Sequence, residues 1–292
     1  MMKKIGIVTD SHSSLSPAAA AELGVHVLPM PFRIDGVDYL EGVNLTREEF
    51  FAHQRAGASI GTSQPAPADV LALWDELLEQ YETLLYMPIS SGLSGSCETA
   101  LLLTEDEPYA SRVFVVDNGR IATPLHRSIL DAIELVEQGY SAPEIRSALE
   151  KSRDELTIYI AVQTLEYLRK GGRISGATAA VGTLLNIKPI LALTTGKLES
   201  YKKARGMVKA REIMLESIRS DLAIRFADAQ SRGDVHLLAA GSASPEETAR
   251  WIAQIEAAFP GMPVLYDDLS LGVSCHTGEG ALGVGLSVRP RV

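Results

Sequence analysis

The sequence predicts an α/β protein in which a first domain with a parallel sheet is followed by a second α/β domain with a mixed sheet. Through the first half of the chain, short apolar runs alternate with helical patterns, as in parallel βαβ units. A serine or threonine followed three residues later by glutamate marks two helix starts, at TREE (46–49) and SAPE (141–144). In the second half, TTGK (194–197) separates two strand-like runs and predicts an antiparallel hairpin, so strand directions in this sheet are expected to be mixed.

The strands of the first half are predicted from short apolar runs. They are expected at residues 5–9, 25–34, 37–39, 83–89 and 113–116. The Asp35-Gly36 pair is a favoured hairpin turn between the second and third of these runs. Three helices are expected to begin at about residue 47, at residue 96 and after residue 141. Two more are expected around residues 70–78, which have an apolar helical face, and over 121–137.

The second half has its own series of strands and helices. Strands are expected at residues 157–162, 188–193, 198–203, 235–240, 264–266 and at the end of the glycine-rich segment 278–288. A short helix is expected to end at Gly171-Gly172, a long one to cover 207–226, and a third to be capped by Ser244. We expect a boundary at 151–155, which divides the chain into domains 1–155 and 156–292.

Charge and cysteine content limit the classes of function. The net charge is −10, and an acidic surface repels polyanions, so neither nucleic acid nor an anionic membrane is expected as the main ligand. The two cysteines, Cys97 and Cys275, fit no zinc or redox spacing, and no metal or cofactor is expected. The N-terminal apolar run is too short for a signal peptide, and no run reaches the roughly 20 residues of a membrane span. We therefore expect a soluble protein of the reducing cytoplasm.

Two segments rich in hydroxyl groups are candidates for binding a small anion. In GTSQPAP (61–67), the hydroxyls of Thr62 and Ser63 could cap the following helix or point at a ligand. SSGLSGS (90–96) lies between a strand and a helix, where glycine lets the backbone approach a ligand and the helix N-terminus offers free N–H groups. Ser94 and Gly95 are therefore candidates for an anion site. The segment has neither the lysine of a phosphate-binding loop nor the spacing of a hydrolase nucleophile elbow.

Three further polar segments are less specific. TDSHSS (9–14) follows the first strand, where its side chains could cap a helix or face a ligand. In KGGRIS (170–175), Arg173 could lie beside an anion or be an exposed charge after a helix end. In SCHTG (274–278), Cys275 and His276 are expected to point to opposite faces of an extended segment, so they would not form a catalytic dyad. His276 is expected to make one hydrogen bond in a polar site.

These five segments, in this order, resemble the DegV family of bacterial fatty-acid-binding proteins, and the resemblance runs from residue 4 to about 288. It implies a Rossmann-like first domain, a second α/β domain, and a fatty acid buried in a tunnel between them. It implies that Thr62 and Ser94 hydrogen-bond the carboxylate. Ser63 and the Gly95 backbone would stand close by, with His276 in the surrounding network. The family turn after the first strand often lacks a histidine, so no role is carried over to His12.

The same resemblance implies a partner, because the family includes the binding subunits of bacterial fatty acid kinase. The bound acid would be presented to a separate kinase subunit, which supplies ATP and phosphorylates the carboxylate for phospholipid metabolism. Arg173 would lie near the head group or on the surface that faces the kinase, and Arg205 would take part in docking. Transient contact with a membrane is compatible with this role.

The residues alone leave two enzymatic alternatives. A serine or cysteine hydrolase acting on a lipid or acyl ester would use Ser94 or Cys97, although no Ser-His-Asp arrangement is evident in the chain. A nucleotide-binding kinase would need a lysine–serine/threonine phosphate signature, which this chain lacks.

Overall fold

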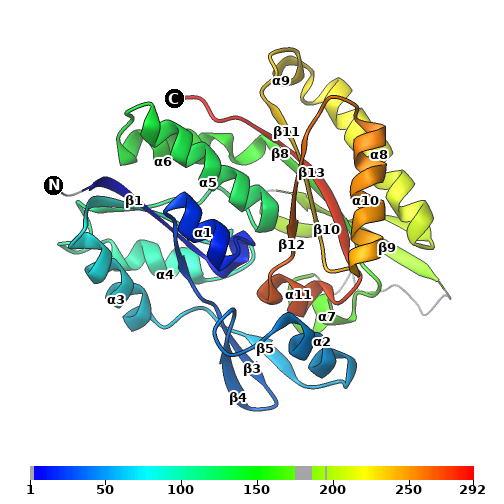
Figure 1. Cartoon of the computed structure of the whole chain (residues 1–292), viewed down its shortest axis with the longest axis horizontal. Helices are drawn as coiled ribbons and strands as arrows, with labels where there is room; N and C mark the ends of the chain where they lie inside the picture. Colours follow the sequence, from blue (N-terminus) through cyan, green and yellow to red (C-terminus); the bar gives the residue numbers. More distant parts are fainter. Residues whose placement is uncertain (1–2, 175–185, 195) are drawn as a thin grey trace. The chain divides into compact units, whose positions relative to one another are not determined.

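The computed structural model describes residues 3–174, 186–194 and 196–292 (Figure 1). Two residues of the segments considered above, Ser175 and Thr195, lie outside this part of the chain. None of the described helices is both long enough and apolar enough to cross a lipid bilayer.

The chain forms two compact units. The first consists of Met1–Arg153 together with Ser270–Gly272 and Pro290–Val292. The second consists of Asp154–Leu269 and Val273–Arg289. The first unit therefore contains two short segments that are distant in sequence from the rest of it, whereas the two parts of the second are separated by only residues 270–272.

A four-stranded parallel sheet forms the centre of the first unit, as predicted. Its strand order is β2-β1-β6-β7. The strands are β1 (Lys3–Asp10), β2 (His26–Leu28), β6 (Tyr81–Met87) and β7 (Val113–Val115). The helices around it are α1 (Pro17–Leu23), α3 (Pro67–Leu78), α4 (Ser96–Leu103), α5 (Ala122–Glu137) and α6 (Ala142–Lys151).

Helices cover both faces of this sheet, because successive side chains of each strand point to opposite sides. Ile7 of β1 packs with α1, α5 and α6, whereas its neighbour Val8 packs with α3 and α4. Figure 1 shows α5 and α6 on one side of these strands and α3 and α4 on the other. The carboxyl ends of the strands, where ligands bind in such sheets, carry segments 9–14 and 90–96.

The prediction of one strand over 25–34 was wrong. The run divides into β2 and β3 (Pro31–Ile34), which belong to different sheets. Pro29 and Pro31 flank the break, and proline has no N–H to continue a strand ladder. β3 pairs antiparallel with β4 (Val37–Leu40) and with β5 (Ile60–Thr62) in a small separate sheet.

The hairpin and both capping boxes of the first unit are confirmed. Asp35 and Gly36 have φ values of 48° and 85° between β3 and β4, as a two-residue hairpin turn requires. Thr46 and Glu49 cap α2 (Arg47–Arg55) reciprocally. Ser141 and Glu144 do the same for α6.

A six-stranded mixed sheet forms the second unit, with strand order β10-β9-β8-β13-β11-β12. The pair β11–β12 is parallel and the other neighbours are antiparallel, which confirms the predicted hairpin between β9 and β10. The strands are β8 (Leu156–Ala161), β9 (Ile187–Thr194), β10 (Lys197–Arg205), β11 (Val235–Gly241), β12 (Val264–Asp268) and β13 (Leu282–Val288).

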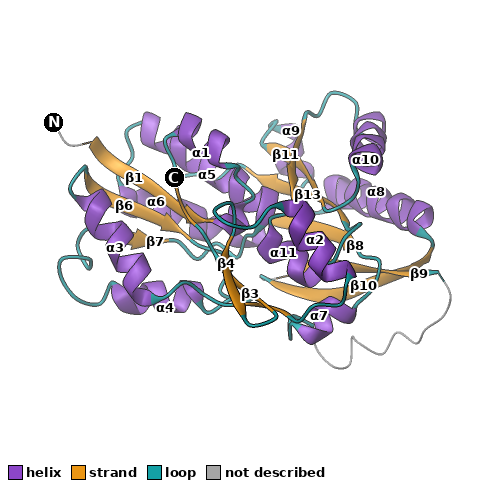
Figure 2. Ribbon diagram, turned by 60° about the horizontal axis from the view of Figure 1, so that its bottom comes forward, coloured by secondary structure: helices purple, strands orange, loops and turns teal. Residues whose placement is uncertain are grey.

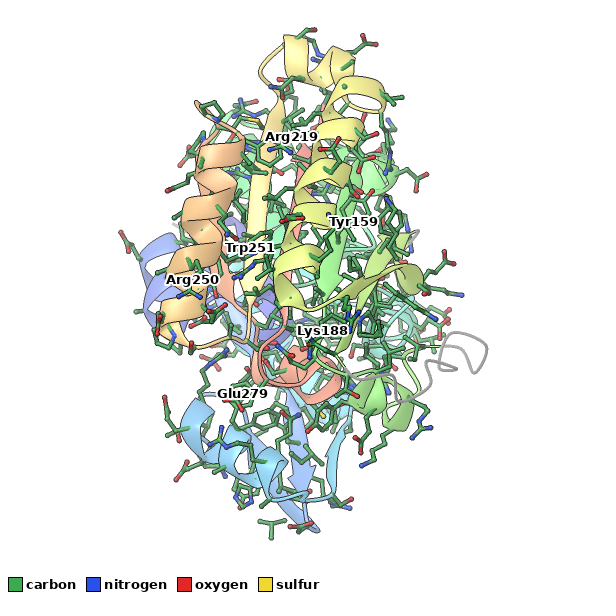
Figure 3. All side chains as sticks on the ribbon, turned by 90° about the vertical axis from the view of Figure 1, so that its right-hand side faces the viewer. Tyr159, Lys188, Arg219, Arg250, Trp251 and Glu279 are labelled. Carbon is green, nitrogen blue, oxygen red and sulfur yellow. The ribbon has the colours of Figure 1, made fainter. Side chains whose placement is uncertain are left out.

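Two long helices pack on one face of this sheet (Figure 2). The helices of the unit are α7 (Glu166–Lys170), α8 (Met207–Ile224), α9 (Ala227–Ser231) and α10 (Pro245–Ala258), with most of α11 (Leu271–Thr277). Trp251 of α10 is fully buried, and its indole N–H donates to the Gly283 carbonyl of β13 at 3.0 Å (Figure 3). That bond satisfies the one polar group of a large core side chain.

The expectation of an extended segment around Cys275 was wrong, because these residues form the helix α11. The segment LGVSCHT contains glycine and β-branched residues and is a poor helix former by itself. The helix begins where the carboxylate of Glu41 accepts the backbone N–H groups of Leu271 and Gly272. A contact across 230 residues of sequence thus caps a helix that the local sequence does not indicate.

Candidate functional site

The serine-rich segment 90–96 is a tight turn that leads from β6 into α4. The N–H groups of Leu93 and Ser94 donate to the Ser90 carbonyl at 3.0 and 3.2 Å. The Ser94 hydroxyl accepts the N–H of Ser96 at 3.2 Å and lies 2.8 Å from the Ser96 hydroxyl. Ser94 therefore caps α4 locally. Because a hydroxyl has one donor and two acceptor positions, it keeps capacity for one further hydrogen bond.

The segment 61–67 lies directly against this turn. The Gln64 amide donates to the Thr99 hydroxyl of α4 at 3.0 Å. A Cβ atom built on Gly95 would lie 2.9 Å from the Gln64 amide oxygen, so this approach requires glycine unless Gln64 moves. Gln64, which sequence reasoning did not single out, thus joins the two hydroxyl-rich segments within the first unit.

Thr62 and Ser63 are positioned by the small sheet. Thr62 ends β5 opposite Phe32 and is half-buried, and the N–H of Ser63 donates to the Pro31 carbonyl at 3.4 Å. The helix that follows, α3, has Ala66 at its N-cap and no side-chain cap. The interpretation of Thr62 and Ser63 as caps of this helix was therefore wrong.

The segment after β1 is held by Asp10, which is fully buried. The Asp10 carboxylate accepts the N–H of His12 and the N–H of Ile89, both at 2.9 Å. It thereby caps the short 3₁₀ turn Ser11–Ser13, as one interpretation of this segment predicted. It also ties the ends of β1 and β6 together, just before the serine-rich turn begins.

In the second unit, segments 170–174 and 274–278 lie side by side. The ring of His276 packs against Gly171, where an added Cβ would lie 2.1 Å from its Nδ1 atom. A guanidinium N–H of Arg173 donates to the Gly171 carbonyl. Gly278, with φ +77°, leaves room for the ring of Tyr167 in α7. Close packing therefore explains Gly171 and Gly278, whereas Gly172 has φ +69° and no atom within 4 Å of an added Cβ, so its backbone conformation is what favours glycine.

Arg205 lies apart from this cluster, at the end of β10. The side chain is exposed on an edge strand, as are those of Lys202 and Lys203, and none of the three forms an ion pair with the described residues. Charged side chains on an edge strand discourage strand-to-strand association.

The cysteines do not have the properties of nucleophiles. Burial, with the nearby Asp117 and Glu150 charges, raises the pKa of the Cys97 thiol to about 12. Burial raises the pKa of Cys275 to about 11, although the Arg173 charge opposes this. Both thiols are therefore protonated at neutral pH. The Ser94 hydroxyl bonds to Ser96 and to no histidine in the described residues, so the hydrolase alternative gains no support.

The family is decided by sequence comparison. A family model described as an uncharacterised protein of the DegV family matches residues 4–289. The chain belongs to the DegV family. A DegV domain-containing protein of Deinococcus radiodurans is 35% identical over 285 residues, which cover 97% of this chain and 98% of the relative. The resemblance inferred from the five segments is thus confirmed.

Solved structures of other DegV proteins have the same fold. One is a DegV family protein from Thermus thermophilus, whose structure is described as showing fatty acid binding. It superimposes with a TM-score of 0.85 at 35% sequence identity, and the superposition covers 98% of this chain and 99% of that one. DegV from Bacillus subtilis, described as a fatty acid binding protein, gives a TM-score of 0.80 at 27% identity, with 98% and 99% covered. The predicted α/β class is confirmed by these similarities.

Proposed function

We propose that this DegV protein binds a long-chain fatty acid in a buried tunnel and holds its carboxylate by hydrogen bonds. Thr62 and Ser94 would bond the carboxylate, with Ser63 and the Gly95 backbone close by and His276 in the surrounding network. The observation that carries the proposal is the Gln64 contact with Gly95 and Thr99, which brings both hydroxyl-rich segments to the start of α4. The solved relatives described as fatty-acid-binding proteins support the choice of ligand.

The N-terminus of α4 suits an anionic head group. Gly95, at its N-cap, is exposed and has no side chain. The Ser94 hydroxyl already accepts the N–H of Ser96, so an anion would use the N–H groups that follow it and the positive end of the helix dipole. These local donors would act against a chain whose net charge is −10.

The acyl tail would supply most of the affinity. A tail of about 14 methylenes has a transfer free energy on the order of 11 kcal/mol, at about 0.8 kcal/mol for each methylene, before the costs of binding. Each hydrogen bond to a charged carboxylate adds about 1.5–3 kcal/mol. The head-group residues would therefore mainly orient the acid.

We further propose that the protein performs no chemistry alone and presents the acid to a separate kinase subunit, which forms the acyl phosphate used in phospholipid metabolism. The raised pKa values of both cysteines are consistent with a binding role. Arg173, anchored on Gly171, would lie near the head group or face the kinase. The exposed Arg205 is available for docking.

Native mass spectrometry of the purified protein, before and after addition of palmitate or oleate, tests the ligand directly. A lipid adduct is expected, and absence of any adduct with either acid would refute fatty acid binding. The double variant Thr62→Ala/Ser94→Ala should raise the Kd at least about tenfold, because two bonds to the carboxylate are lost.

The control is Thr104→Ala/Ser111→Ala, which also removes one threonine hydroxyl and one serine hydroxyl, but at other positions of the first unit. Its Kd should equal that of the wild type. Normal acyl-phosphate formation by the Thr62→Ala/Ser94→Ala variant with a fatty acid kinase subunit would contradict the head-group assignment.

A further inference from the structure

The serine-rich turn that follows β6 is held by a carboxylate that follows the neighbouring strand, β7. Asp117 lies just after β7, and its two carboxylate oxygens accept the hydroxyl and the backbone N–H of Ser91. Oδ2 accepts the Ser91 hydroxyl at 2.6 Å, and Oδ1 accepts the Ser91 backbone N–H at 3.4 Å. One side chain therefore fixes the backbone and the side chain of a residue inside the turn.

Arg153 completes this arrangement. Its Nη1 atom lies 3.0 Å from Asp117 Oδ2 and 3.3 Å from the Asp117 carbonyl oxygen, and its Nη2 donates to the Ser91 hydroxyl at 3.4 Å. Gly119, with φ +69°, leaves room for the guanidinium, since an added Cβ would lie 3.1 Å from Arg153 Nε. The side chains of Asp117 and Arg153 are 21% and 32% exposed, so water screens their ion pair only in part.

The bonds between Asp117 and Ser91 are linked to Ser94 through the backbone of the turn. Ser91 follows Ser90, whose N–H donates to the Arg120 carbonyl at 2.9 Å and whose own carbonyl accepts the Ser94 N–H. Burial alone would raise the pKa of the Asp117 carboxyl, but the bonds from Ser91 and Arg153 outweigh it and lower this pKa. The carboxylate is thus charged at neutral pH, and its bonds to Ser91 are charge-assisted.

We propose that Asp117 and Arg153 are positioning residues for the carboxylate site: they hold the serine-rich turn in place through Ser91 and so strengthen fatty-acid binding without contacting the ligand. This inference rests on the proposed function, because it assigns the head-group part of the affinity to the geometry of Ser94 and Gly95. A hydrogen-bonded frame around a binding group holds it near its productive geometry.

The test is titration of the full chain with a fluorescent long-chain acid, cis-parinaric acid, and displacement of this probe by palmitate. Asp117→Asn should raise the Kd about tenfold, equivalent to about 1.4 kcal/mol. Ser91→Ala, which removes one neutral hydroxyl and leaves the charges in place, should raise it about fivefold. The free energy of unfolding in urea is measured for each variant, so that a loss of folded protein is separated from a loss of affinity.

Two comparisons distinguish positioning from general stability. Asp75→Asn removes a carboxylate that accepts the Tyr109 hydroxyl at 2.7 Å elsewhere in the first unit, and its Kd should stay at the wild-type value. In a Ser94→Ala background, Asp117→Asn should raise the Kd less than it does in the wild type, because one of the two groups that it positions, the Ser94 hydroxyl, is already absent.

The outcomes separate the inference from the proposed function. The inference is overturned if the effects of Asp117→Asn and Ser94→Ala on the binding free energy add in full. It is also overturned if neither Asp117→Asn nor Ser91→Ala changes the Kd. In both cases fatty acid binding itself stands. A wild-type protein that binds neither the probe nor palmitate overturns the proposed function and this inference with it.

Discussion

Alanine at position 171 tests whether the close approach of Gly171 fixes the His276 ring. The added Cβ would lie 2.1 Å from His276 Nδ1 and 2.5 Å from its Cε1, whereas ordinary contact begins at 3.4 Å. The ring must therefore move by about 1.3 Å, the difference between 3.4 and 2.1 Å. Gly171 has φ −78°, so alanine introduces no backbone strain and the cost arises from the ring. Overpacking of this kind costs about 1–3 kcal/mol, and we expect about 2 kcal/mol for Gly171→Ala.

The assay is a double-mutant cycle with His276→Ala, in which the free energy of unfolding in urea is measured for all four proteins. Once the ring is absent, the methyl group has space. In the His276→Ala background, Gly171→Ala should therefore lower the free energy of unfolding by less than half as much as it does in the wild type. The expected coupling energy is about 1 kcal/mol or more. Additive free energies would refute the proposed packing of His276 on Gly171. The palmitate Kd of Gly171→Ala should also rise, because the displaced ring belongs to the proposed head-group network.

Two further predictions concern the first unit. Burial raises the pKa of Asp131 to about 6, despite the nearby Arg127, so between about pH 4 and 6 the folded state keeps a proton that the unfolded state has released. This contribution to stability falls as the pH rises through that window. In urea titrations, the free energy of unfolding of Asp131→Asn should therefore increase relative to that of the wild type by up to about 3 kcal/mol between pH 4 and 7. A difference between the two proteins that does not change with pH would contradict the raised pKa. Gly95→Ala should displace the Gln64 amide, weaken palmitate binding several-fold and change the unfolding free energy by less than about 1 kcal/mol, because the far end of a flexible side chain can move. Gly61→Ala, whose Cβ would meet no atom within 4 Å, is the control, and equal Kd values for the two variants would argue against a role for the Gln64 contact.

Local sequence was sufficient for the features that depend on near neighbours. The reciprocal cap of Thr46 and Glu49 and the Asp35-Gly36 turn form as predicted, because their hydrogen bonds and dihedral angles involve residues within three positions of each other. The alternation of apolar runs and helical patterns likewise indicated the parallel sheet, since burial on both faces requires continuous apolar strands. Ser94 and Gly95 were singled out from their position between a strand and a helix.

Other features depended on residues far apart in the chain. Pro29 and Pro31 mark a break within 25–34, but tertiary pairing decides which sheet β2 and β3 each join. The helix α11 forms where Glu41 accepts its first N–H groups. Asp117 and Arg153 reach Ser91 across 26 and 62 residues, and nothing near them in the sequence indicates this contact.

The sequence by itself determined the family, the fold class and the segments that carry the candidate site, because these reside in local patterns and their order. The tertiary structure alone decided how those segments are held. Gln64 joins the two hydroxyl-rich segments, and Gly171 receives the His276 ring. Such contacts depend on distances of a few ångströms between residues remote in sequence, and only the packed chain sets those distances.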